Sequence, residues 1–68
     1  MNVLLNGDRR EVAEASTVAD AVELAGGEPG ERGVAVAVDG EVVSRGEWET
    51  THLSEGQAVE VVRAVQGG

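Results

Sequence analysis

The apolar residues of the chain fall into short stretches whose spacing predicts β-strands. In residues 1–5, Val3 and Leu5 lie on one side of an extended strand and Leu4 on the other. Residues 34–38 alternate valine with alanine, a pattern typical of a strand with one covered face. The chain therefore offers one strand at its start and another in its middle.

The last predicted strand covers residues 58–65. Glu60 lies within it, and a carboxylate cannot be buried without a partner. The alternation therefore sends Val59 and Val61 toward the core and leaves Val62 on the opposite face.

Two dipeptides predict tight turns between paired strands. Asn-Gly at residues 6–7 and Asp-Gly at 39–40 suit two-residue hairpins, because a type I′ turn needs positive φ at both central positions. The first turn predicts a return strand at residues 9–13, charged as an edge strand tends to be. The second predicts a return strand at 41–43.

One short helix is predicted after Thr17. The threonine hydroxyl can accept a hydrogen bond from the first turn, and Asp20 completes a capping box and favours the helix dipole. Apolar residues recur at i, i+3, i+4 and i+7 over residues 18–25, which is one helical face. The glycines at 26–27 end the helix, and Pro29 prevents its continuation.

The order of these elements predicts an α+β protein with a ubiquitin-like β-grasp fold. One helix can cover only one face of the sheet, and the apolar first and last strands belong together at its centre. A crossover through the helix makes some strand pairs parallel. We expect a mixed sheet of about five strands with one main helix on one face, over residues 1–65. Residues 26–33 form a mobile loop, and residues 66–68 a flexible tail.

Composition excludes several classes of function. The 68 residues include 13 acidic residues, five arginines, no lysine, no cysteine and one histidine, with a net charge of −8. Disulfides and Cys/His metal sites are excluded, and the charge argues against nucleic acid and anionic membranes. It favours docking on a basic protein surface, although solubility alone explains it equally well. With no membrane-spanning run or signal peptide, we expect a soluble cytoplasmic protein.

No grouping of residues predicts an enzyme. His52 lies in a predicted loop without an evident catalytic partner, so we expect it at the surface. Trp48, the one aromatic residue, is expected to anchor this loop over one end of the core. Arg45 is expected to stack on the ring or to bridge to Glu47 and Glu49, with partner binding as the alternative.

The face of the sheet away from the helix is the predicted docking surface. The strand pattern leaves Leu4, Val62 and Val43 exposed there. A contiguous apolar patch marks an interaction site, whereas scattered exposed apolar residues are ordinary. We expect docking, because one helix must leave one face open.

The chain ends in a diglycine directly after the last predicted strand. A carboxylate that enters a narrow active site to be adenylylated needs a backbone without Cβ atoms, as Gly67 and Gly68 provide. With Gln66 they form an extended tail that a partner can grip through main-chain hydrogen bonds. A frayed terminus is the alternative.

Taken together, these segments resemble the thiamine-biosynthesis sulfur carrier proteins, the ubiquitin-like ThiS family. The resemblance covers nearly the whole chain and rests on Thr17-Val18, Val38-Asp39, Val42-Val43-Ser44-Arg45-Gly46-Glu47-Trp48, Glu55-Gly56 and the terminal Val65-Gln66-Gly67-Gly68. Family members commonly show Val-Pro-Arg-x-x-Trp. Here Ser44 replaces the proline, which is expected to loosen the loop.

The resemblance implies a carrier that is not itself an enzyme and binds no cofactor. A ubiquitin-activating-like adenylyltransferase would use ATP to adenylylate Gly68. A sulfur donor such as a cysteine desulfurase would convert the adenylate to a thiocarboxylate, and thiazole synthase would receive the sulfur. The alternatives are the small subunit of molybdopterin synthase, another sulfur carrier, a ubiquitin-like protein modifier, and a binding module with an inert tail.

Overall fold

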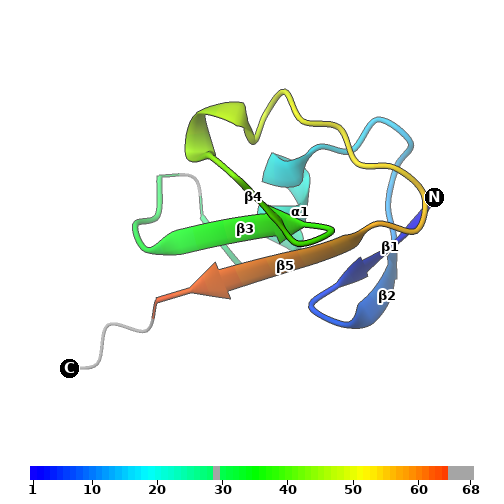
Figure 1. Ribbon diagram of the computed structural model, residues 1–68, viewed down its shortest axis with the longest axis horizontal. Helices are drawn as coiled ribbons and strands as arrows, with labels where there is room; N and C mark the ends of the chain where they lie inside the picture. The colour runs from blue at the N-terminus through cyan, green and yellow to red at the C-terminus, as the bar shows by residue number, and fades with distance from the viewer. Residues whose placement is uncertain (29, 65–68) are drawn as a thin grey trace.

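The computed structural model describes residues 1–28 and 30–64, which form a five-stranded sheet packed on one side by a helix (Figure 1). The elements follow the predicted order. They are β1 (Asn2–Leu5), β2 (Asp8–Glu11), α1 (Val18–Leu24), β3 (Val34–Val38), β4 (Glu41–Val43), the 3-10 helix η1 (Arg45–Glu47) and β5 (Ala58–Arg63).

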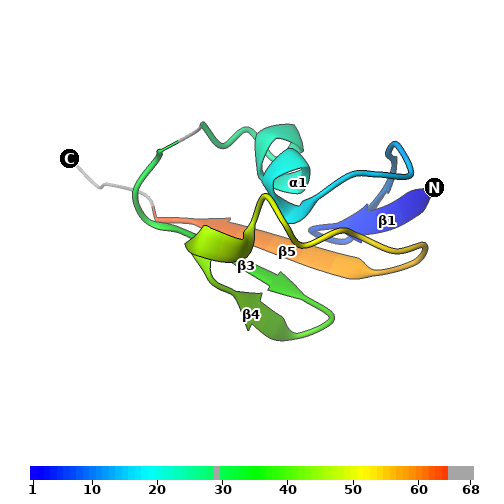
Figure 2. The same ribbon diagram turned by 90° about the horizontal axis from the view of Figure 1, so that it is seen from above.

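The sheet is mixed, with the strand order β2-β1-β5-β3-β4. The first and last strands, β1 and β5, are neighbours and run parallel, whereas the other three strand pairs are antiparallel. Figure 2 shows α1 on one side of this sheet. The arrangement confirms the predicted β-grasp. Among the described residues, no helix has the length and apolar character needed to cross a membrane.

Both predicted hairpin turns are present, with positive φ at each central residue. Asn6 and Gly7 have φ of 50° and 87°, and Asp39 and Gly40 have φ of 49° and 86°, as a type I′ turn requires. The strand β2 begins and ends earlier than predicted, because pairing with the four residues of β1 sets its length. The strand β5 ends at Arg63, so Ala64, which was predicted to be part of it, lies after the strand, and the predicted end at position 65 lies outside the described residues.

The helix begins as the capping pattern predicts. The Thr17 hydroxyl accepts a hydrogen bond from the Asp20 backbone N–H at 3.4 Å, and the Thr17 N–H donates to the Asp20 carboxylate at 2.9 Å. Two N–H groups that the helix itself cannot satisfy are thereby bonded. The chain leaves the helix through Gly26, whose φ is 90°.

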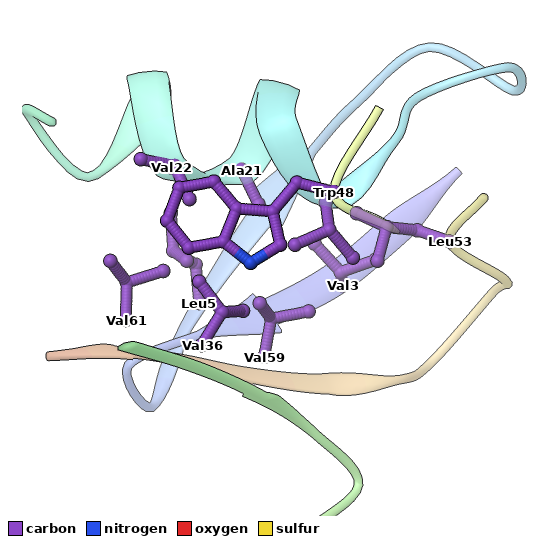
Figure 3. Packing of buried hydrophobic residues seen from close by; sticks show 10 residues of the cluster. Val3, Leu5, Ala21, Val22, Val36, Trp48, Leu53, Val59 and Val61 are labelled. Atoms are coloured by element: carbon purple, nitrogen blue, oxygen red, sulfur yellow. The ribbon is translucent and has the colours of Figure 1, made fainter. Parts of the chain in front are cut away.

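The core lies between α1 and the helix-facing side of the sheet. Its buried side chains are Val3, Leu5, Val18, Ala21, Val22, Val36, Trp48, Leu53, Val59 and Val61. This set confirms the inward direction predicted for the alternate residues of β1 and β5. Figure 3 shows the Trp48 ring between the helix and the strands. Trp48 is 7% exposed and so anchors the segment after β4 to the core, as predicted.

Candidate functional site: the last strand, its open face and the root of the tail

The residues predicted to carry the chemistry are Gln66, Gly67 and Gly68, and they lie outside the described residues. The flexibility of the tail therefore stays a prediction. The structure describes the strand that leads to the tail, β5, which lies between β1 and β3 (Figure 1). We call Arg63 and Ala64, the last two described residues, the tail root.

Side chains from both hairpin turns fasten β5 in place. The Asn6 side chain accepts a hydrogen bond from the Val61 N–H at 2.8 Å and donates to the Val61 carbonyl at 3.2 Å. Because β1 ends one residue earlier, this amide continues the parallel ladder. The Asp39 carboxylate accepts from the Ala58 N–H at 3.0 Å. The strand before the tail is thus held from both neighbouring hairpins.

The loop before β3 fastens the tail root. Arg63 donates to the two carboxylate oxygens of Glu31, from Nε at 2.9 Å and from Nη2 at 3.2 Å. The Ala64 N–H donates to the Gly33 carbonyl at 2.7 Å. Gly33 has φ of +75°, and a Cβ there would lie 2.8 Å from the Ala64 Cβ, so this approach requires glycine. The Arg45 guanidinium also donates to the Glu31 carbonyl.

The Glu31–Arg63 pair changes the ionisation of both groups. The hydrogen bond from Arg63, together with that from the Glu28 backbone N–H, holds the pKa of Glu31 below its ordinary value. The same pairing raises the pKa of Arg63. Arg63 stays charged at any pH at which the protein is studied. A change of pH therefore breaks this ion pair only by protonating Glu31.

We expect the contribution of Glu31 to stability to disappear in acid. A carboxyl group whose pKa is lower in the folded than in the unfolded chain stabilises the fold above its ordinary pKa, here 4.5, and loses that effect as the pH falls through the lowered value. Urea unfolding should therefore show Glu31→Gln less stable than wild type near pH 7, with the difference shrinking near pH 3.

The matched control for this prediction is Glu23→Gln, because Glu23 is an exposed glutamate of α1 that forms no ion pair with another described residue. Its effect on the unfolding midpoint should be small at both pH values. NMR titration should place the pKa of Glu31 below its ordinary value of 4.5. A Glu31 pKa at or above 4.5, or a Glu31→Gln effect independent of pH, would contradict the assignment.

The sheet surface opposite α1 carries a group of apolar side chains on β1, β5, β3 and β4, with the Glu60 carboxylate among them. Cross-strand pairing places Leu4 beside Ala58, Ala35 beside Val62, and Ala37 beside both Glu60 and Val42. We call this surface the docking face; its residues are Leu4, Ala35, Ala37, Val42, Ala58, Glu60 and Val62. Leu4 is 42% exposed, Val62 61% and Val42 79%. The predicted exposure of Leu4 and Val62 is confirmed.

The placement of Val43 on this face was wrong. The two-residue turn pairs Val38 with Glu41, so Val43 comes opposite the buried Val36. Side chains paired across strands share one face, and Val43 accordingly packs against the core. Its neighbour Val42 occupies the exposed position instead.

Arg45 stacks on Trp48, as predicted, with its guanidinium carbon 4.5 Å from the ring centroid. The predicted bridge to Glu47 and Glu49 is wrong, since neither carboxylate pairs with Arg45 among the described residues. The guanidinium donates to the Glu31 carbonyl instead. Arg45 therefore connects the indole to the loop that holds the tail root.

Ser44 keeps the backbone shape that a proline would impose. Its φ is −67°, close to the value fixed by the proline ring. Its hydroxyl donates to the Glu47 carboxylate at 2.9 Å, and its carbonyl accepts from the Glu47 N–H at 2.9 Å. Serine therefore holds the backbone at this position in a conformation that a proline could also adopt.

The described residues present no catalytic grouping. His52 is exposed, with its Nδ1 3.3 Å from the Ala15 carbonyl. A groove of about 390 Å³ between α1 and η1 is lined by Ala19, Val22, Glu23, Glu28, Gly30, Arg45, Gly46, Trp48 and Glu49, with no nucleophile and base side by side. Within residues 1–28 and 30–64, no three His, Cys, Asp or Glu side chains gather as metal ligands.

Sequence reasoning missed the roles of Glu31 and Val42. Glu31 lies 32 residues from Arg63, and nothing in the local pattern indicates their pairing. Val42 could have been found, because a two-residue turn fixes the register of the hairpin. The position of Glu60 on the same face as Leu4 and Val62 follows from the predicted strand pattern, but its pairing with Ala37 was not predicted.

Comparisons with known proteins agree with this fold. The model of the ThiS family matches residues 3–68. A crystal structure of a thiamine biosynthesis protein (ThiS) from Geobacter metallireducens is 30% identical, with 100% of both chains covered and a TM-score of 0.76. An NMR solution structure of a thiamine biosynthesis protein from the same organism is 31% identical, with 100% of this chain and 88% of that chain covered and a TM-score of 0.79. No curated protein matches the chain.

Proposed function

Because the chain belongs to the ThiS family, we propose that it carries sulfur as a thiocarboxylate on Gly68 and donates it to thiazole formation. Family membership and the two similar structures support a sulfur carrier role in thiamine biosynthesis. The observation that carries the proposal is the family match, which runs through the whole fold to Gly68.

The proposed chemistry activates a carboxylate and then replaces one of its oxygens. A carboxylate oxygen of Gly68 attacks the α-phosphorus of ATP and displaces pyrophosphate, giving an acyl-adenylate. The terminal sulfur of a persulfide attacks the acyl carbon, and AMP leaves. A thiol then reduces the S–S bond, so that the sulfur stays on the glycyl carbonyl and the donor leaves as a disulfide.

In this scheme the chain positions the reacting group and other proteins supply the catalysis. Glycines at 67 and 68 place no Cβ atoms beside the carboxylate, which suits a narrow channel. Four residues follow Ala64, and an extended chain spans at most about 3.6 Å per residue, so Gly68 reaches at most about 14 Å beyond the tail root. The activating enzyme must therefore contact the folded body, and the docking face is the surface proposed for that contact.

The partners follow from the same chemistry. We propose a ubiquitin-activating-like adenylyltransferase, which binds the ATP, a sulfur donor such as a cysteine desulfurase, and thiazole synthase as the sulfur acceptor. The chain acts as a co-substrate and holds no cofactor of its own. The need for ATP favours the cytoplasm. Nucleic acid and anionic membranes are not proposed as partners, because the net charge is −8.

Complementation tests the pathway. The full chain should restore growth of a thiazole-requiring strain that lacks its own carrier, whereas the chain without residues 67–68 should not. Rescue by the shortened chain would contradict sulfur transfer through Gly68. Isopeptide-linked target proteins without any thiocarboxylate would favour a protein modifier instead.

A further inference from the structure

We propose that Glu60 selects the partner, and that the surface of the activating enzyme covering the docking face is apolar with one arginine or lysine opposite this carboxylate. The inference rests on the proposed function, because the partner is the adenylylating enzyme. The inference adds to the proposed apolar contact the requirement that the partner place a positive charge opposite Glu60.

Glu60 lies at the middle of the docking face. Its strand, β5, is the central strand of the five. Along that strand, the open-face residues are Ala58, Glu60 and Val62, so the carboxylate is flanked by two apolar residues. Across the sheet, Glu60 pairs with Ala37. Because the alanine side chain is short, the longer glutamate side chain projects further from the sheet than its neighbour does.

Among the described residues, Glu60 has no cationic partner for its charge. The large exposed residues of the face are Leu4, Val42 and Val62. No cationic group of the described residues forms an ion pair with Glu60. Arg9 shares the face but lies on the edge strand β2, opposite Leu4. In the free protein, water solvates the carboxylate.

Docking changes the energetics of this carboxylate. A partner that covers Leu4, Val42 and Val62 removes water from the glutamate between them. A buried carboxylate without a partner is strongly unfavourable, whereas one paired with a hydrogen-bonded cation is tolerated. An arginine fits best, because its planar fork bonds both carboxylate oxygens. The Glu60 carboxylate thereby disfavours partner proteins whose surface is purely apolar or acidic.

A second copy of the chain does not fit this requirement. Two copies that meet through the docking face about a two-fold axis present the same residues to each other. With Glu60 near the centre, such a dimer brings two carboxylates together. The negative charge of the whole chain, −8, adds to the repulsion. The occupant is therefore a partner with a cationic surface.

Binding of Glu60 variants to the adenylyltransferase of the same organism tests the proposal. Glu60→Gln should raise the Kd by at least about 30-fold, the cost of removing one member of a buried charge pair. Glu60→Arg should raise it further. Glu60→Leu should also weaken binding, even though it makes the face more apolar. Equal or tighter binding of Glu60→Gln or Glu60→Leu would overturn the proposal.

Glu41→Gln is the matched control. Glu41 is an exposed glutamate of the same sheet, and its cross-strand partner Val38 packs against the core. Glu41 therefore lies on the core-facing side of the sheet, away from the docking face. Its Kd should stay within about twofold of wild type, since rim and remote charges contribute little to affinity. Far-UV circular dichroism should show every variant folded.

Two outcomes separate the proposed function from this inference. If wild type is neither bound nor adenylylated, the proposed function fails. If wild type is adenylylated and the Glu60 variants bind as well as wild type, only this inference fails.

Discussion

Replacing Gly68 by alanine is expected to abolish thiocarboxylate formation while leaving the thermal unfolding midpoint nearly unchanged. The added Cβ lies next to the reacting carboxylate, where the proposed channel has room only for backbone. The buried core of the described residues is built from side chains between Val3 and Val61, so we expect folding not to depend on Gly68. Mass spectrometry after incubation with the activating enzyme, ATP and sulfur donor measures the first effect, and a thermal melt measures the second.

Gly46→Ala is the matched control for this variant. A Cβ at Gly46 meets nothing within 4 Å, and its φ lies outside the range that excludes other residues. This change should leave both the unfolding midpoint and sulfur loading at wild-type values. A Gly68→Ala protein that loads sulfur at the wild-type rate would refute the assignment of Gly68. A large loss of stability in that variant would show that the tail is packed.

Trp48→Ala is expected to unfold the domain. Removing a buried tryptophan costs about 3–5 kcal/mol, and a core of this size supplies roughly 3–5 kcal/mol of net stability. The indole lies between helix and sheet (Figure 3), and its N–H donates to the Val43 carbonyl at 3.0 Å. Urea titration followed by far-UV circular dichroism should show little folded protein even without denaturant.

Two further variants calibrate this prediction. Trp48→Phe keeps much of the apolar contact but removes the indole N–H that donates to the Val43 carbonyl, a loss of about 0.5–1.5 kcal/mol, so it should fold with a lower urea midpoint. Val42→Ala changes an exposed residue of the docking face and should stay within about 0.5 kcal/mol of wild type. A Trp48→Ala protein with the wild-type midpoint would contradict the core described here.

Features set by local backbone chemistry could be predicted from the sequence. The turn at residues 6–7 follows from the positive φ values that asparagine and glycine tolerate. The start of the helix follows from the reciprocal bonds of Thr17 and Asp20. The faces of β1 and β5 follow from the two-residue period of a strand. In each case the signal lies within a few residues of the feature.

Features set by distant contacts could not be predicted in the same way. Arg45 donates to a carbonyl 14 residues earlier in the chain instead of bridging to its neighbours Glu47 and Glu49. Glu31 meets Arg63 only because the fold brings their segments together. The Val43 error is different, since counting the register outward from the Asp-Gly turn at residues 39–40 would have corrected it.

The candidate site divides in a similar way. Gly67 and Gly68 were proposed from the chemistry of an activated carboxylate, and they lie outside the described residues. What the structure adds is the support around them: a clamped last strand, a tail root fastened through Glu31, and an open apolar face with Glu60 in it. These depend on pairing between strands far apart in the sequence.

The intact mass of the chain tests the central claim most directly. Incubated with its activating enzyme, ATP and a persulfide sulfur donor, the full chain should gain the mass difference of one oxygen replaced by sulfur, and fragmentation should locate the change at Gly68. Omitting ATP should prevent the gain. An unchanged mass under conditions in which the same enzyme and donor load a known carrier would contradict the account.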